Sequence, residues 1–428
     1  MTSSSLTSSL IMLAKSGIRG QVDPEAEYAA LNSHSWDELT ALAEAHGLLG
    51  MMGTGAETAN LIIPEKTTTL LRRTRRISAI RFDRAWLQIT EIVEAWEQMG
   101  IESVHLKGVS FAARHYPTPE MRAFGDIDLL ILPHERDQAA DVLVQLGYRC
   151  TDDLDSGGKE WCLANHFHWK FMREGAFPVE LHWKLTFSFP PTPADLTVIW
   201  ARTLRMSSPA GEIRCLEPED EVLALAAHMT SHCFRLPLRC HADIMAMVRN
   251  FTPEQWENLW ERAVKMEQQR DILAVLGVGN RLGLTDLPVA MMDRIAADRT
   301  LDLKFLVEYA LRCPFVAAPE RWLDVQNAPT QRAALGRMWH VFFPRYTHLW
   351  TPQGEVQSKN RPSLVYVAAW TRRAARLLGR LRDLPQLAAD CRQTTRVHKM
   401  FGDRRRLKAS EEQRTDLNSY EEAQIKVQ

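Results

Sequence analysis

The sequence lacks the patterns that mark secreted, membrane-spanning and thiolate-metal proteins. Its seven cysteines are dispersed and include no Cys-x-x-Cys pair, so neither a disulfide framework nor a cysteine zinc site is indicated. No apolar run approaches the length that crosses a bilayer, and the apolar stretch 10–14 is too short for the core of a signal peptide. We therefore expect free thiols, no transmembrane segment and a cytoplasmic location.

The chain also lacks a net charge of either sign. Its 52 basic residues nearly cancel its 53 acidic residues, so no overall field draws it to nucleic acid or to a membrane. Hydrophobic residues make up 45% and charged residues 25%, a globular composition that excludes a wholly disordered or fibrous chain. The 428 residues are about two to three times the length of a typical domain, so we expect more than one packed unit.

Helical periodicity dominates most of the chain. The pattern predicts a long helix over 67–99 that ends at Gly100. Its buried side is predicted to carry the apolar residues Ile77, Ile80, Leu87, Ile92, Val93 and Trp96. Helical patterns return from residue 191 onward, and the segment after Pro218 has the acidic first turn of a helix.

Residues 103–185 alternate between strand and helix patterns, and we expect no other part of the chain to do so. Strands are predicted over 103–106, 126–132, 167–172 and 179–185, with a helix over 134–146. The segment 126–132 (DIDLLIL) is the nearly continuous apolar run of a strand that is covered on both faces. The predicted fold class is therefore α+β, a small mixed-sheet core embedded in a mostly helical chain.

These patterns divide the chain. We predict an N-terminal helical region (1–77), an α/β core (78–190), a helical domain (191–350), a basic helical region (351–408) and a disordered tail (409–428). Lys and Arg far outnumber acidic residues in 359–408, which could contact RNA phosphates or an anionic membrane. We favour the simpler interpretation of a solvated helix face.

Asp126 and Asp128 are the sharpest feature of the core. Side chains alternate along a strand, so both carboxylates point the same way, about 6–7 Å apart. Two adjacent carboxylates at the end of an apolar strand repel each other and lose solvation, and a divalent cation shared with substrate phosphates would compensate them. The alternative is structural: both aspartates bind backbone amides or Arg122.

Glu180 interrupts the apolar pattern of the predicted strand 179–185, in the sequence VELHW. A third carboxylate opposite the aspartate pair would complete a two-metal site for in-line phosphoryl transfer, as a shared ligand or as a base. The alternative is that Glu180 pairs across the hairpin with Lys170 or Arg173. His182 shares the face of Glu180, and His168 lies on the preceding strand, so both are predicted as possible residues of the acceptor side.

The segment Lys107-Gly108-Val109-Ser110 joins the first strand to a short helix. Such a junction exposes backbone N–H groups that can hold a triphosphate, and Lys107 and Ser110 can add side-chain contacts. Arg122 precedes the aspartate pair and could reach the triphosphate or brace Asp126. We predict Lys107, Gly108, Ser110 and Arg122 as nucleotide-binding residues.

These residues together resemble a known family. LKGVSFAARHYPTPEMRAFGDIDLLI, followed by a helix, a histidine-rich strand and VELHW, is similar to uncharacterised bacterial nucleotidyltransferases of the polymerase-beta-type superfamily. The resemblance covers residues 78–190. The superfamily pattern is a Gly-containing turn, an Asp-x-Asp or Asp-x-Glu pair and a third carboxylate, and these positions fall on Gly108, Asp126, Asp128 and Glu180. One departure lies at the turn, where Val109 follows Gly108 in place of a second Gly or a Ser.

The resemblance implies the transfer of an NMP, with AMP as the default, from an NTP to an acceptor hydroxyl with release of pyrophosphate. Asp126, Asp128 and Glu180 would be both the catalytic residues and the ligands of Mg²⁺ or Mn²⁺. The acceptor stays open between a small molecule, a protein and an RNA end.

Three alternatives compete with this hypothesis. A catalytically inactive nucleotidyltransferase fold could serve as a binding scaffold. An Asp-x-Asp glycosyltransferase is ranked lower, because it would need a larger nucleotide-binding α/β half before residue 100. A separate metal site at His228 and His232 is not favoured, since the HxxxH spacing lacks the glutamate of HExxH.

Overall fold

The computed structural model describes residues 3–22, 35–152, 163, 166–186, 189–312, 393–397 and 399–401. The chain forms two compact units: residues 1–152, 160–314 and 404–428 make the first, and 153–159 and 315–403 make the second. The described part of the second unit is the helical segments 393–397 and 399–401. Apart from these segments, the predicted basic region 351–408 and tail 409–428 lie outside the described residues. None of the described helices has the length and apolar character to cross a membrane.

A seven-stranded mixed sheet organises the first unit, with the strand order β3-β4-β5-β2-β1-β7-β6. The strands are β1 (Val104–Leu106), β2 (Ile127–Leu130), β3 (Arg149–Cys150), β4 (His168–Met172), β5 (Val179–His182), β6 (Leu204–Ser208) and β7 (Gly211–Cys215). β2 pairs antiparallel with β1 and parallel with β5, and β5 pairs antiparallel with β4. The predicted α+β class and the four predicted strands are confirmed.

The β6–β7 hairpin corrects the prediction that only 103–185 would contain strands. β7 pairs parallel with β1 and places the hairpin at the edge of the same sheet. All five side chains of β6 are exposed or half-buried, so its sequence LRMSS does not show the apolar alternation of a core strand. An edge strand needs one pairing neighbour rather than two buried faces, and its sequence signal is correspondingly weak.

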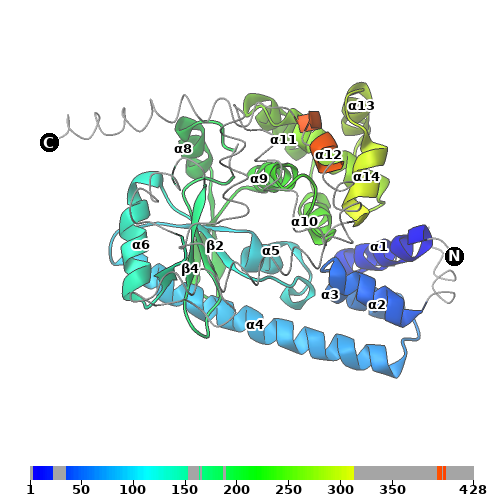
Figure 1. The fold of residues 1–428 in the computed structure, drawn as a ribbon, viewed down its shortest axis with the longest axis horizontal. Helices are drawn as coiled ribbons and strands as arrows, with labels where there is room; N and C mark the ends of the chain where they lie inside the picture. Colours follow the sequence, from blue (N-terminus) through cyan, green and yellow to red (C-terminus); the bar gives the residue numbers. More distant parts are fainter. Residues whose placement is uncertain are drawn as a thin grey trace, which may run out of the picture. The chain divides into compact units, whose positions relative to one another are not determined.

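Helix α4 (Glu65–Glu97) runs beneath the sheet toward α2 and α3 (Figure 1). Ile92, Val93 and Trp96 are buried as predicted, but Ile77, Ile80 and Leu87 are exposed, which makes that part of the prediction wrong. The buried positions of the helix are Thr67, Leu71, Ala85, Trp86, Gln88, Ile89, Ile92, Val93 and Trp96. The first half of the helix therefore buries little of its apolar surface against the described residues, and the second half packs on the core.

Two side-chain contacts of α4 hold the connection between β4 and β5. Gln88 donates from Nε2 to the carbonyl of Phe177 at 2.8 Å and accepts from the Phe177 N–H at 2.8 Å. Arg173 binds Glu91 with N–O distances of 2.8 and 2.6 Å. This second contact contradicts the alternative that Arg173 pairs with Glu180. The helix thus fixes the loop from which the Glu180 strand starts.

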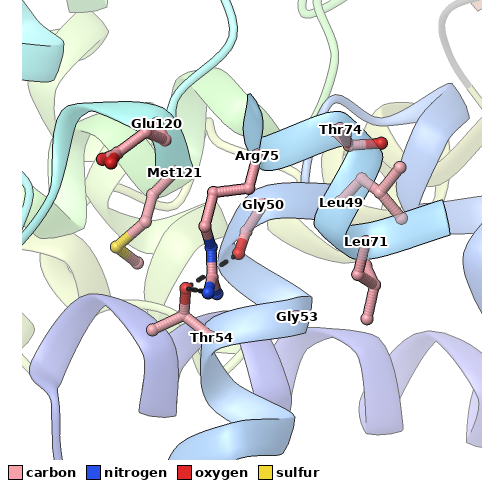
Figure 2. A pocket seen from close by; sticks show the side chains of 9 residues that line it. All are labelled: Leu49, Gly50, Gly53, Thr54, Leu71, Thr74, Arg75, Glu120 and Met121. Atoms are coloured by element: carbon pink, nitrogen blue, oxygen red, sulfur yellow. Dashed lines mark hydrogen bonds between the residues drawn. The ribbon is translucent and has the colours of Figure 1, made fainter. Parts of the chain in front are cut away.

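The N-terminal helices are α1 (Ser3–Arg19), α2 (Trp36–Ala45) and α3 (Leu49–Thr58), and they share one apolar cluster with α10 (Arg239–Val248). Glycine also allows α3 to approach a neighbouring short helix closely. A Cβ on Gly50 would lie 2.6 Å from the Met121 carbonyl oxygen in the short helix η2 (Pro119–Met121). Figure 2 shows the small hollow beside this contact, where Arg75 of α4 lies next to Thr54 and Gly50 of α3. The hollow shares no residue with the predicted site.

Of the remaining described helices, some lie beside the sheet and others pack on neighbouring helices. They are α5 (Lys107–His115), η3 (Pro133–Glu135), α6 (Arg136–Gln145), α8 (Pro193–Ala201), α9 (Pro218–Ser231), α11 (Pro253–Lys265), α12 (Gln269–Arg281), α13 (Val289–Ala297) and α14 (Leu303–Arg312). Helix α9 is buried along most of its length and packs against α10, α11 and α12 (Figure 1). α5 packs against the strands β1 and β2, next to the predicted site.

Candidate active site

The carboxylates predicted from the sequence meet on one face of the sheet. Asp128 of β2 is the register partner of Glu180 on the parallel strand β5, and Asp126 lies immediately before β2. Paired residues of neighbouring strands lie about 4.8 Å apart and point to the same side. The structure therefore brings all three carboxylates together, at the point where β2 begins.

The turn after β1 lies directly against this pair. Lys107 and Gly108 both have positive φ values, 36° and 39°. A Cβ on Gly108 would lie 3.2 Å from the backbone oxygen of Asp126 and 3.9 Å from Oδ2 of Asp128. Glycine is favoured here for its backbone freedom and for the close approach it permits. The predicted Gly-containing turn and the carboxylates are thus parts of one site.

Asp128 is held by two cationic or polar neighbours. Lys107 Nζ lies 3.3 Å from Oδ1 of Asp128, and His182 Nε2 lies 3.0 Å from the same oxygen. Burial opposes ionisation of Asp128, but the Lys107 ammonium and the hydrogen bond with His182 outweigh it, so the pKa of Asp128 lies well below its usual range. Asp128 is therefore an ionised carboxylate inside the protein.

Asp126 has the opposite electrostatic environment. Burial and the negative charges of Asp128 and Glu180 raise its pKa from 3.8 to about 6. Glu180 is also partly buried, yet its contact with His182 lowers its pKa. The three carboxylates thus carry more negative charge than the adjacent Lys107 neutralises, and at neutral pH Asp126 is ionised at a cost in free energy.

Two histidines complete the face. His168 and His182 are register partners on β4 and β5. His182 Nε2 lies 3.6 Å from Oε2 of Glu180, and His168 Nε2 lies 3.8 Å from the same oxygen. Burial, together with the neighbouring His182, lowers the pKa of His168 to about 4, so this ring is neutral at physiological pH.

Arg122 lies behind the turn. Its guanidinium makes a two-point contact with Asp243 of α10, with N–O distances of 3.0 and 2.8 Å, and donates to the carbonyl of Gly108 at 3.1 Å. The hydroxyl of Tyr116 donates to the same aspartate at 2.6 Å. The buried Asp243 was missed as a partner of Arg122, although an acidic residue inside the apolar helix CHADIMAMV is a sequence signal for a buried ion pair.

Ser110 contacts the strand β7. It is buried, and its Oγ lies 3.5 Å from Sγ of Cys215 on β7. Of the four predicted nucleotide-binding residues, Lys107 and Gly108 therefore adjoin the carboxylates directly, Arg122 reaches them through the backbone of Gly108, and Ser110 contacts the neighbouring strand. Their roles toward a nucleotide stay predictions.

The donor atoms fit a divalent cation. Three carboxylates converge, and the raised pKa of Asp126 reflects burial and then charge crowding, which a cation would relieve. Among the described residues, the donor atoms that lie within 4.8 Å of one another belong to His168, Glu180 and His182, and the predicted ligands Asp126 and Asp128 fall outside this group. The HxxxH pair falls outside this group: the rings of His228 and His232 contact each other, with centroids 4.6 Å apart.

Comparison with known families decides the class of the protein. The model of a family described as uncharacterised nucleotidyltransferase matches residues 32–282, more than half of the chain. The chain belongs to this family. The match extends well beyond residues 78–190, where the sequence resemblance was seen, and it includes the helices α2 and α3 and the helices α9 to α12. Family membership supports a nucleotidyltransferase activity for this protein.

Solved structures similar to this nucleotidyltransferase are distant. The antibiotic-resistance factor ANT(2'')-Ia shares 15% identity with a TM-score of 0.31, and the match covers 42% of this chain and 94% of that chain. An antigenic nucleotidyltransferase-like protein from Paracoccidioides brasiliensis shares 15% identity with a TM-score of 0.29, covering 49% and 97%. Similarities this weak carry no information about the substrate. No curated protein sequence matches the nucleotidyltransferase significantly.

Proposed function

We propose that the protein is a metal-dependent nucleotidyltransferase that moves an NMP, AMP by default, from an NTP to an acceptor hydroxyl. The observation that carries this proposal is the register of Asp128 with Glu180, with Asp126 and the Gly108 turn against them. A turn that exposes backbone N–H groups beside clustered carboxylates is what a triphosphate with its cation requires.

In the proposed reaction the acceptor oxygen attacks the α-phosphorus, and the bond from that phosphorus to the pyrophosphate oxygen breaks. Asp126, Asp128 and Glu180 would hold Mg²⁺ or Mn²⁺. When bound, the metal supplies charge neutralisation for the phosphates and lowers the pKa of the acceptor hydroxyl. Glu180 would be a shared ligand of the metal or would accept the hydroxyl proton as a base. Catalysis would be mainly positioning and charge neutralisation.

Other residues would orient the substrates. The backbone N–H groups after Gly108 would bind the triphosphate, and Lys107 would turn from Asp128 toward it when a cation takes over the charge of that carboxylate. Arg122 would fix the turn through its bond to the Gly108 carbonyl. His168 and His182 border Glu180 and are candidates for the acceptor side.

Nucleotide binding tests the proposal without knowledge of the acceptor. Thermal unfolding would be followed with each of the four NTPs, with and without Mg²⁺ or Mn²⁺. A ligand at a hundred times its Kd adds about 2.7 kcal/mol of stability. We expect a metal-dependent shift in Tm that the double variant Asp126→Asn/Asp128→Asn loses and that Glu174→Gln, a change at an exposed residue of the β4–β5 loop, retains.

A folded wild-type protein with no metal-dependent shift for any NTP would contradict the proposal and favour the inactive scaffold. A shift with a nucleotide sugar in place of an NTP would favour the glycosyltransferase alternative.

A further inference from the structure

Two imidazole nitrogens face the same carboxylate oxygen of the site. His168 on β4 and His182 on β5 are register partners, and their Nε2 atoms lie 3.8 and 3.6 Å from Oε2 of Glu180. Two ligand atoms bound at about 2.1 Å to one ion are at most about 4.2 Å apart. Both nitrogen–oxygen distances are within that limit, and the whole group spans 4.8 Å, so a small inward movement of the two rings would complete a coordination shell.

The orientation of the His182 ring is a second, independent observation. Its Nδ1 lies 3.3 Å from the backbone carbonyl oxygen of Lys184. A carbonyl oxygen only accepts, so Nδ1 carries a hydrogen, and Nε2 is the nitrogen directed at the carboxylates. Nε2 faces Oδ1 of Asp128 and Oε2 of Glu180. In the metal-free protein the proton of the hydrogen bond to Asp128 lies between these atoms, and a bound cation would take its place.

A hydrogen bond from Nδ1 to a backbone carbonyl is also the arrangement that fixes metal-binding histidines in the correct tautomer. Nδ1 of His168 is buried and has no such partner among the described residues, so only the closeness of its Nε2 to Glu180 marks this ring as a ligand.

We propose that His168, Glu180 and His182 form a binding site for a divalent transition-metal ion, with Mn²⁺ or Zn²⁺ preferred over Mg²⁺. Imidazole nitrogens favour borderline ions, whereas Mg²⁺ takes oxygen ligands almost alone. The proposal rests on the proposed function in one respect: Glu180 is common to both, so this ion would occupy the second of the two metal positions. Asp126 and Asp128 would hold the other ion with the triphosphate.

The test uses Mn²⁺ as the probe on the full chain without nucleotide. Mn²⁺ titration followed by electron paramagnetic resonance gives the affinity, and electron spin echo modulation detects ¹⁴N bound directly to the ion. We expect ¹⁴N coupling in the wild type. His168→Gln should weaken the coupling and lower the Mn²⁺ affinity at least about tenfold. A loss of this size is already typical when a residue that only hydrogen-bonds a metal ligand is replaced. His134→Gln, at an exposed histidine of η3, is the control and should change neither.

Variants separate this site from the proposed activity. Asp126→Asn should keep the ¹⁴N coupling while it loses the metal-dependent response to NTP. One outcome would overturn the inference: Mn²⁺ binds without ¹⁴N coupling and with equal affinity in wild type and His168→Gln. That outcome would leave the carboxylate site intact and would favour the acceptor-side role for the histidines. Absence of any Mn²⁺ binding would also overturn it. His168 is partly exposed, so His168→Gln is expected to fold. His182 is fully buried, so a substitution there could unfold the protein and is not used.

Discussion

The strained carboxylate of Asp126 makes a quantitative prediction for the substitution Asp126→Asn. Burial and the charges of Asp128 and Glu180 raise its pKa from 3.8 to about 6. Each pKa unit corresponds to about 1.36 kcal/mol, so keeping Asp126 ionised costs up to about 3 kcal/mol. Its side chain is only partly buried, and solvent screening reduces this cost to roughly 1–2 kcal/mol.

The sign of the effect follows from proton linkage. Below pH 3.8 the carboxyl is protonated in both the folded and the unfolded chain and costs nothing. As the pH rises to about 6, the unfolded chain ionises first, and the folded protein loses stability relative to it. Without metal, Asp126→Asn should therefore be more stable than the wild type at pH 8, and this difference should shrink toward pH 4.

Chemical unfolding at pH 4.5, 6 and 8 measures this difference, with and without Mn²⁺. Added Mn²⁺ should stabilise the wild type more than the variant at pH 8, since the cation relieves a repulsion that the amide no longer has. Asp83→Asn, at an exposed position of α4, serves as the matched control. If Asp126→Asn were destabilising by the same amount at every pH, the carboxylate would be making a favourable contact and the argument from charge crowding would be wrong.

Three further predictions concern the framework of the site. Gly108→Ala should destabilise the protein by about 1–2 kcal/mol, because a side chain is strained at a φ of 39° and would press on a backbone oxygen; urea unfolding measures this. Asp243→Ala should cost about 3–5 kcal/mol by leaving the buried Arg122 unpaired, and a loss below 1 kcal/mol would refute a structural role for that pair. Trp86→Ala should cost about 3–5 kcal/mol, whereas Leu87→Ala, one residue along α4 but 72% exposed, should stay within about 0.5 kcal/mol; equal losses would contradict the observed helix phase.

The elements that the sequence predicted well are those with local signals. The apolar run that contains Asp128 and the alternation around Glu180 marked two strands, and both occur where expected. The carboxylates stood out because each interrupts an apolar pattern. Their in-register pairing could not be predicted from spacing, since it depends on β5 joining β2 in parallel after a connection that includes α6, β3 and β4.

The parts that could not be predicted depend on tertiary contacts. The buried face of α4 was predicted wrongly at Ile77 and Ile80. Both residues follow helical periodicity, but that stretch of the helix packs against few of the described residues. The partner of Arg122 lies 121 residues away on α10, beyond the reach of any local pattern. The orientation of His182 depends on a backbone carbonyl two residues away, and no residue preference reveals it.

Helix α4 has a consequence for how the protein unfolds. One continuous helix of 33 residues buries Leu71 at the N-terminal helices, Trp86 against His105 of β1 and Trp96 against α6. The predicted domain boundary at residue 77 falls inside this helix. A fragment that begins there would lack the turns that pack on α3. A fragment that ends there would lack the turns that pack on the core. The helix thus couples the two regions mechanically. Amide protons of the N-terminal helices and of the sheet should exchange with solvent through a common opening event, as parts of one cooperative unit.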